Sequence, residues 1–149
     1  MSKSKRNPSK APKRQYAAIP IRIKGNGKPK VLLLTSRGTK RWVIPKGWPI
    51  RKLGAAGTAA REAYEEAGVK GRIHVPIGRY RYRKPELSAR VGKITVKVFL
   101  MEVKRQVSDW PEQRQRKTRW FKPRRAAALV AEPELAALLA RIPKLAGRL

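Results

Sequence analysis

Apolar residues occur along the chain in short runs, separated by basic segments or by segments rich in glycine and proline. This pattern is typical of β-strands joined by turns. Strands are predicted at residues 16–23, 31–35, 41–44, 78–83, 91–103 and 120–121. In the first of them, Pro20 favours an edge strand or a bulge. Segment 78–83 alternates three arginines with two tyrosines, which predicts one cationic side and one aromatic side.

Three other segments have the composition and spacing of helices. One helix is predicted over about 58–67, with Gly57 and Thr58 at its start and Gly68 just after its end. Two helices rich in alanine and leucine are predicted at 124–131 and 134–140, separated by Pro133. The resulting order of strands and helices predicts an α+β fold with a mixed sheet, rather than a regular doubly wound sheet.

The composition excludes several classes of protein. The chain has 149 residues, which suits one domain. It has no cysteine and one histidine, His74, which excludes disulfide scaffolds, zinc knuckles, thiol catalysis and iron–sulfur clusters, and also a histidine-rich metal site. No apolar run approaches the roughly 20 residues that a membrane span needs. We therefore expect a cytoplasmic protein with no membrane association; the sequence does not indicate an oligomeric state.

The charge is strongly unbalanced. Lysine and arginine number 38 against 9 acidic residues, which gives a net charge of +29. Such a charge attracts polyanions, and by itself it is typical of a ribosomal or nucleoid protein. Residues 1–15 are predicted to form a disordered basic arm that binds nucleic acid non-specifically, and residues 16–149 to form the folded domain.

The distribution of the acidic residues indicates a different chemistry. No acidic residue precedes Glu62, and then Glu62, Glu65 and Glu66 follow within five positions. On a helix, positions i, i+3 and i+4 share one face, so these carboxylates would repel one another unless a cation neutralised them. Mg²⁺ or Mn²⁺ would suit such oxygen ligands. An ordinary solvated helix face is the alternative explanation. Arg61 is placed to pair with Glu65 four residues later.

Residues 47–69 resemble the signature of the Nudix hydrolases. This signature is a Gly, five residues, a Glu, seven residues, and then Arg-Glu-apolar-x-Glu-Glu-x-Gly-apolar. The residues that match it are Gly47, Arg61, Glu62, Ala63, Glu65, Glu66, Gly68 and Val69. The sequence departs from it at Leu53, which stands where the first Glu is expected. The resemblance implies a Nudix-type α/β/α sandwich with a mixed sheet.

The flanking segments resemble the branch of this family that is like the diphosphoinositol polyphosphate phosphohydrolases. Segments 31–37 and 41–48 carry this likeness, together with Asp109-Trp110 and the stretch from Arg116 to Phe121. The resemblance implies hydrolysis of a phosphoanhydride by water, with Mg²⁺ or Mn²⁺ as cofactor. It implies that Glu62, Glu66 and the main-chain carbonyl of Lys46 bind the metal, and that Glu65 activates the water.

The expected substrate is highly anionic, of the diphosphoinositol polyphosphate or dinucleoside polyphosphate type. Arginine suits bidentate recognition of phosphate, although in so basic a chain each cation could also be an ordinary surface residue. The residues expected to contact the substrate are Arg37, Arg41, Lys46, Gly47, Trp48 and Arg116. Two alternatives remain open: a basic nucleic-acid-binding protein on a Nudix scaffold, and an enzyme acting on the 5′ pyrophosphate end of RNA.

Overall fold

The structure is a computed structural model that describes residues 13–84 and 92–149. Its strands are β1 (Arg14–Ile23), β2 (Pro29–Thr35), β3 (Trp42–Val43), β4 (Lys46–Gly47), β5 (Val69–Arg83), β6 (Lys93–Gln106) and β7 (Thr118–Phe121). Its helices are a 3₁₀ turn at Arg51–Leu53, α1 (Gly54–Ala67), α3 (Pro123–Leu129), α4 (Pro133–Ala140) and α5 (Ile142–Ala146). No helix in these two ranges is both long and apolar enough to cross a membrane.

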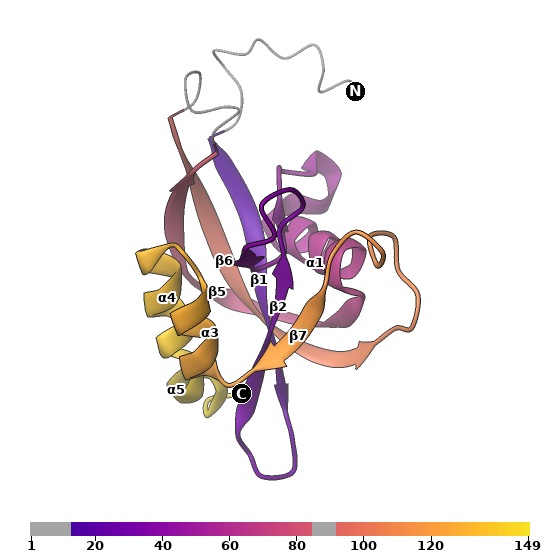
Figure 1. Cartoon of the computed structure of the whole chain (residues 1–149). Helices are drawn as coiled ribbons and strands as arrows, with labels where there is room; N and C mark the ends of the chain where they lie inside the picture. Colours follow the sequence, from indigo (N-terminus) through magenta and orange to yellow (C-terminus); the bar gives the residue numbers. More distant parts are fainter. Residues whose placement is uncertain (1–12, 85–91) are drawn as a thin grey trace.

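The described strands form one mixed sheet with β1 near its centre (Figure 1). Strand β1 runs antiparallel to β2 and β4 and parallel to β6. Strand β5 runs antiparallel to β6 and lies at the edge, while β3 and β7 both pair with β2. Because β4 and β2 pair with different parts of β1, the sheet brings the segment around Lys46 close to the start of β1.

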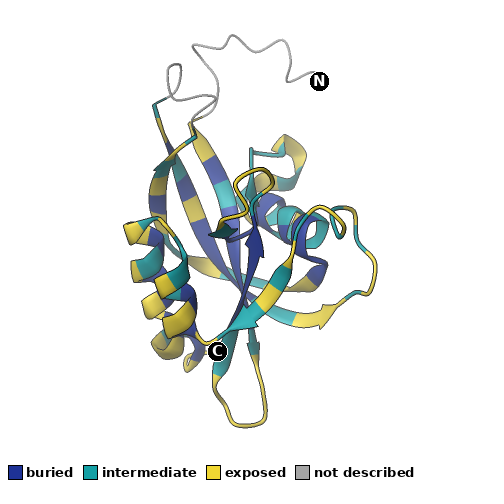
Figure 2. Ribbon diagram, viewed as in Figure 1, coloured by how far each residue is buried: buried dark blue, intermediate teal, exposed yellow. Residues whose placement is uncertain are grey.

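Helices cover both faces of the sheet, so the molecule has three layers (Figures 1 and 2). On one face, α1 packs through Ala59, Ala63 and Ala67, whose small side chains let the helix approach the strands closely. On the other face, α4 and α5 bury Leu135, Leu139 and Ile142. The α+β fold with a mixed sheet, predicted from the order of elements, is confirmed.

Several boundaries differ from the predicted ones. Strand β1 begins at Arg14, two residues before the predicted start of the folded domain, so Arg14 and Gln15 belong to the sheet. The arm predicted to be disordered comprises residues 1–15. Of these, residues 1–12 lie outside the described part of the chain. Helix α1 begins at Gly54 rather than near Thr58. Thr58 therefore lies in the second turn, where its hydroxyl donates to the Gly54 carbonyl at 2.6 Å instead of capping the helix.

Strand β5 begins at Val69, directly after α1, whereas the sequence predicted a strand only from Gly78. Irregularities in its pairing with β6 occur between Lys70 and Gly71 and on both sides of Pro76. These irregularities interrupt the alternation of side chains, and therefore hide the first half of the strand from a period-two pattern. Strand β4 and helix α5 are short and were not predicted.

Candidate active site

A hollow of about 430 Å³ lies beside the acidic face of α1. Glu62 and Glu66 of α1 line one side of it, and Lys46, Gly47 and Trp48 line another. Glu112 and Arg116 also line it, from the segment 107–117 that we call the 107–117 loop. Arg37, which follows β2, lines it as well, so the structure brings together most of the residues predicted for metal and substrate from four separate parts of the chain.

Glu62 and Glu66 form a close carboxyl pair. Their side chains share a hydrogen bond, and Glu66 is only 5% exposed. Burial, followed by the hydrogen bond from Glu62, raises the pKa of Glu66 well above its ordinary value, while Arg116 acts in the opposite direction. Two carboxyl groups that share a proton in this way form a strongly anionic pocket once that proton is lost.

Gly47 has a specific reason to be glycine. A Cβ added to it would lie 2.4 Å from Cδ of Glu62 and 2.5 Å from Oε2, so a side chain here would displace the carboxylate. Gly47 thus packs its bare backbone against Glu62, and Lys46 precedes it in β4. The main chain of β4 and the Glu62 carboxylate face each other across this contact.

Glu65 occupies a different position from its two neighbours. Its carboxylate lies 3.9 Å from Nη1 of Arg61, the pair that the sequence predicted, and its side chain is 36% exposed. Glu65 is not among the residues that line the hollow. Its main chain does contribute to the site, because the Glu65 carbonyl accepts a hydrogen bond from the Glu112 amide at 2.9 Å.

Glu112 is a carboxylate of the hollow that the sequence did not single out. Its Oε1 accepts a hydrogen bond from Nε of Arg116 at 2.7 Å, and the same arginine donates to the Thr35 carbonyl at 3.3 Å. The Arg116 side chain is 10% exposed, so it is held firmly between β2 and the 107–117 loop. The signal that could have identified Glu112 is its place four residues before Arg116 in a chain with few acids.

The 107–117 loop is attached to the C-terminal end of α1 by hydrogen bonds. The last carbonyls of a helix have no partner within it, and here four consecutive ones accept bonds from outside the helix. Three donors lie in the loop: the Glu112 amide bonds Glu65, the Trp110 indole bonds Glu66, and the Val107 amide bonds Gly68, the residue directly after the helix. The fourth donor, the side-chain amide of Gln106 at the end of β6, bonds Ala67. These bonds hold Glu112 and Arg116 opposite Glu66.

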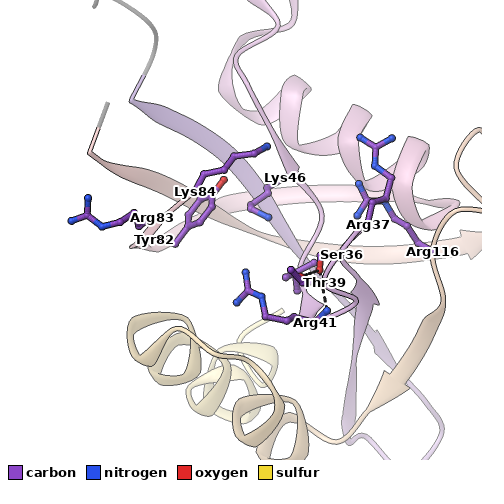
Figure 3. Close-up of a pocket in the computed structure, with 10 residues that line it drawn as sticks. Ser36, Arg37, Thr39, Arg41, Lys46, Tyr82, Arg83, Lys84 and Arg116 are labelled. Carbon is purple, nitrogen blue, oxygen red and sulfur yellow. Dashed lines mark hydrogen bonds between the residues drawn. The ribbon is translucent and has the colours of Figure 1, made fainter. Parts of the chain in front are cut away.

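A second hollow of about 290 Å³ adjoins the first and is strongly cationic (Figure 3). All four of the predicted phosphate-binding side chains line it: Arg37, Arg41, Lys46 and Arg116. Arg83 and Lys84, which follow each other at the end of β5, also line it; the sequence did not place them in the site. In Figure 3, Arg41 and Lys46 lie between the other labelled side chains, while Arg83 points away from them.

Like Arg116, the other three predicted phosphate-binding side chains have partners among neighbouring residues. Nη1 of Arg41 lies 3.3 Å from Oε2 of Glu132, at the start of α4. The Lys46 ammonium lies 5.1 Å from the centre of the Tyr82 ring, and the Tyr82 hydroxyl donates to Gln15 at 2.6 Å. Burial lowers the pKa of Lys46, and the neighbouring Glu66 and Glu132 partly offset this effect. Arg37 is exposed and donates to Gln115 at 2.9 Å.

The oxygen atoms around Glu62 are of the type that binds a hard divalent cation. Within 13–84 and 92–149, no three acidic or histidine side chains are grouped closely enough to hold a metal ion by themselves. The pair formed by Glu62 and Glu66 supplies two carboxylates, and the bare backbone at Gly47 leaves room beside one of them. Oxygen ligands of this kind suit Mg²⁺ or Mn²⁺, which also retain water and bind phosphate oxygens.

We expect Glu66→Gln to stabilise the metal-free protein, by an amount that increases with pH. The raised pKa of Glu66 means that the folded protein holds a proton that the unfolded chain loses near pH 4.5. Wild-type stability therefore falls as pH rises from about 4.5 through the raised folded pKa, and glutamine abolishes this loss. Thermal melts in EDTA between pH 4 and 8 measure the difference.

The same melts with added Mg²⁺ give the complementary result. A cation that binds only the folded state raises the melting temperature of the wild type. The variant lacks one of the two carboxylates and should gain much less. Equal gains for both proteins would contradict the participation of Glu66, and a variant less stable than the wild type at pH 8 in EDTA would contradict the burial argument.

The fold and the site together define a three-layer α+β domain whose acidic helix faces a cationic hollow. Residues 13–142 match the family described as NUDIX domain. The chain therefore belongs to this family, which confirms the resemblance drawn from residues 47–69.

The chain is similar to several curated members of the family. It is 34% identical over 105 residues to Nudix hydrolase 13, mitochondrial, of Arabidopsis thaliana, an alignment that covers 66% of this chain and 52% of the relative. It is 32% identical over 94 residues to diphosphoinositol polyphosphate phosphohydrolase 3-beta of Homo sapiens, covering 62% and 54%. The chain thus spans about half the length of the curated relatives it matches.

Solved structures of similar fold include a C. elegans Ap4A hydrolase binary complex. It has a TM-score of 0.70 and 21% identity, and the match covers 91% of this chain and 98% of that one. A NUDIX hydrolase from Nitrosomonas europaea has a TM-score of 0.65 and 20% identity, with coverage of 87% and 86%. At these identities the likeness shows the fold.

Proposed function

We propose that this protein is a cytoplasmic, metal-dependent pyrophosphohydrolase that cleaves a phosphoanhydride in a highly anionic substrate. The observation that carries the proposal is the junction of two hollows, one holding the Glu62–Glu66 pair and the other holding several cations. The relatives named diphosphoinositol polyphosphate phosphohydrolase and Ap4A hydrolase support a substrate of the diphosphoinositol or dinucleoside polyphosphate type.

The proposed metal ligands are Glu62, Glu66 and the main-chain carbonyl of Lys46. When bound there, Mg²⁺ or Mn²⁺ would offset the charge that develops on the phosphoryl oxygens. Gly47 keeps the backbone against Glu62, and the hydrogen bonds of the 107–117 loop fix the end of α1 that carries Glu66. The carboxylate pair is thereby held in one geometry before the substrate enters.

Glu65 is the proposed base that accepts a proton from the attacking water. Its ion pair with Arg61 is long and partly exposed, so rotating the carboxylate out of that pair costs little. Catalytic contacts often tighten only when substrate binds, so its place in this structure is compatible with the role. Glu112 is the second candidate for the base, because its carboxylate already lines the hollow.

The phosphates of the substrate are proposed to contact Arg37, Arg41, Lys46 and Arg116. These side chains come from three segments that meet around one opening, so several phosphates can be bound at once. Gly47 and Trp48 line the larger hollow and are the proposed contacts for the rest of the substrate. Arg83 and Lys84 would extend the cationic surface toward the end of β5.

Release of phosphate, pyrophosphate or nucleotide products from a panel of substrates, with Mg²⁺, with Mn²⁺ and with EDTA, tests the proposal. The panel contains a diphosphoinositol polyphosphate, Ap4A, ADP-ribose and a short RNA with a 5′ triphosphate. We expect metal-dependent release from the first two. Release only from the RNA would favour the alternative of an enzyme acting on RNA ends, and no release from any member would contradict a hydrolytic function.

Arg37→Ala should reduce kcat/KM more for the polyphosphates than for ADP-ribose. Arg37 is exposed and lines both hollows, so its removal deletes a phosphate contact without opening the core. A charge-assisted hydrogen bond is worth roughly 1.5–3 kcal/mol, or about one to two decades in kcat/KM. Arg124→Ala, on the exposed side of α3, is the control for a general loss of charge. Equal losses on all substrates would contradict the assignment of Arg37.

A further inference from the structure

A group of cations lies on the face of the sheet that α1 covers only in part. In the register of β1, β6 and β5, Tyr16, Lys97 and Arg79 lie in one cross-strand row. Residues in such a row point to the same face. The next row contains Arg14, Thr95 and Arg81, and the row after it contains Lys93 and Arg83. The register thus places basic residues in three successive rows, of which Arg81 pairs with Glu134 of α4 and Arg83 lines the second hollow of the candidate active site.

Arg14, Arg79 and Lys97 line neither hollow of the candidate active site, whereas Arg83 lines the second of them. The residues between the basic positions of β5 and β6 are Tyr80, Tyr82, Ile94 and Val96, which pack in or against the core under α4. Figure 2 shows the corresponding alternation of exposed and buried positions on these strands. Alternation along the strands therefore places Arg79 and Lys97 on the opposite side of the sheet from Tyr80, Tyr82 and Val96.

A hollow of about 390 Å³ occupies the cationic face. Its lining is Arg14, Pro76, Gly78, Arg79, Thr95 and Lys97, and it shares no residue with the two hollows of the candidate active site. None of the described residues that line it is acidic. The three cations that line it come from three different strands and border the same hollow.

The three lining cations lack acidic partners in the described part of the chain. Arg81, in contrast, is paired with Glu134 of α4 at 3.0 Å. Arg14, Arg79 and Lys97 are exposed and take part in none of the ion pairs of residues 13–84 and 92–149. Like charges held together on a rigid sheet repel one another, and an anionic ligand relieves this repulsion.

We propose that this sheet-face site, made of Arg14, Arg79, Lys97 and Thr95, binds the phosphate backbone of single-stranded nucleic acid. Arg14 lies one row away from Arg79 and Lys97, about 6.7 Å along the strands, so an extended chain of phosphates can contact both rows. Half-buried Tyr16 adds an aromatic ring to the row of Lys97 and Arg79. Cations combined with aromatic side chains are typical of surfaces that bind single strands without sequence preference.

The site is independent of the proposed hydrolytic function, because the two share no residue. It also differs from the predicted arm in residues 1–15: all its members except Arg14 lie in the folded domain beyond that arm. Backbone contacts carry no base information, so RNA and DNA of the same sequence should bind alike.

Binding of a labelled 12-nucleotide single strand to the full chain, measured by fluorescence anisotropy over a salt series, tests the proposal. The test variant combines Arg14→Gln, Arg79→Gln and Lys97→Gln. The control combines Arg124→Gln, Arg125→Gln and Lys144→Gln, which replace three exposed cations of α3 and α5. The control therefore loses the same number of positive charges as the test variant. RNA and DNA strands are compared with a duplex of the same length.

The test variant should bind the single strand at least about 10-fold more weakly than the wild type. Its slope of log K against log salt should also be shallower by about 2, since three phosphate contacts are lost and each contributes roughly 0.7. The control should keep most of the affinity and slope. Equal losses in the two variants, an unchanged slope in the test variant, or tighter binding of the duplex would each overturn the proposal. Arg79→Gln alone, expected to lower the slope by about 0.7, replaces the triple variant if that fails to fold.

Hydrolysis of the preferred substrate, assayed on the same proteins, is expected to be unchanged in the test variant. Failure of the proposed function would leave the protein inactive in every form, yet binding would still differ between test and control. Failure of the sheet-face site would leave hydrolysis intact and remove that difference. The two outcomes are therefore distinguishable.

Discussion

Replacing Glu65 by glutamine is expected to leave the fold intact and to reduce kcat by about 100-fold or more, the usual scale for losing a general base. The fold should survive because the Glu65 side chain is partly exposed and its one ion pair, with Arg61, is long. Glutamine keeps the size of the side chain but cannot accept the proton. Single-turnover kinetics at saturating metal measure the chemical step directly.

Glu112→Gln is the matched comparison, because its carboxylate lies in the hollow and could serve the same purpose. If Glu112 mainly positions Arg116, its replacement should raise KM more than it lowers kcat. A loss of about 100-fold in kcat for Glu112→Gln, with little change for Glu65→Gln, would transfer the role of base to Glu112. Circular dichroism and melting curves of both variants exclude unfolding as the cause.

Gly68→Ala is expected to destabilise the protein by roughly 2–5 kcal/mol, the sum of two separate effects. Gly68 ends α1 with a φ of +71°, a conformation that costs a residue with a Cβ about 1–2 kcal/mol. An added Cβ would also lie 2.4 Å from the Trp110 ring, and overpacking of this kind costs about 1–3 kcal/mol. Chemical denaturation monitored by fluorescence gives the change in the free energy of unfolding.

Gly54→Ala is the comparison in which an added Cβ meets no neighbour. Gly54 also has a φ of +71°, but its ψ is −176° where that of Gly68 is 20°, and nothing lies within 4 Å of an added Cβ. Its replacement should therefore cost about 1–3 kcal/mol from the backbone alone. A larger loss at Gly68 than at Gly54 measures the contact with Trp110, which attaches the 107–117 loop to α1. A loss of only about 1–2 kcal/mol at Gly68, the cost of its left-handed conformation alone, would show that this ring moves aside freely.

A large part of the fold was predictable from local patterns. Alternation in residues 78–83 and 93–100 correctly indicated the paired halves of β5 and β6, since each has one buried and one exposed side. Gly68 correctly marked the end of α1, because a left-handed residue commonly terminates a helix. The first half of β5 was missed, since its bulges interrupt the pattern, and the start of α1 was missed, since glycine and alanine there resemble a loop.

The candidate site was predictable to a smaller extent. The spacing of Glu62, Glu65 and Glu66 places three carboxylates near one another on α1, but it cannot tell which of them turn inward. The packing of β4 against α1 turns Glu62 toward Gly47, and burial separates Glu66 from the more exposed Glu65. These orientations depend on neighbours that are distant in the sequence.

By itself, the sequence determined the family, the acidic helix and the excess of positive charge, because each of these is written in residue types and short spacings. Only the tertiary structure decided that Glu112 lines the larger hollow and that Arg83 and Lys84 line the cationic one. It also decided that Arg14, Arg79 and Lys97 meet on one face of the sheet. The physical reason is that strand register and the hydrogen bonds at the end of α1 join segments many residues apart. No local pattern encodes such a juxtaposition.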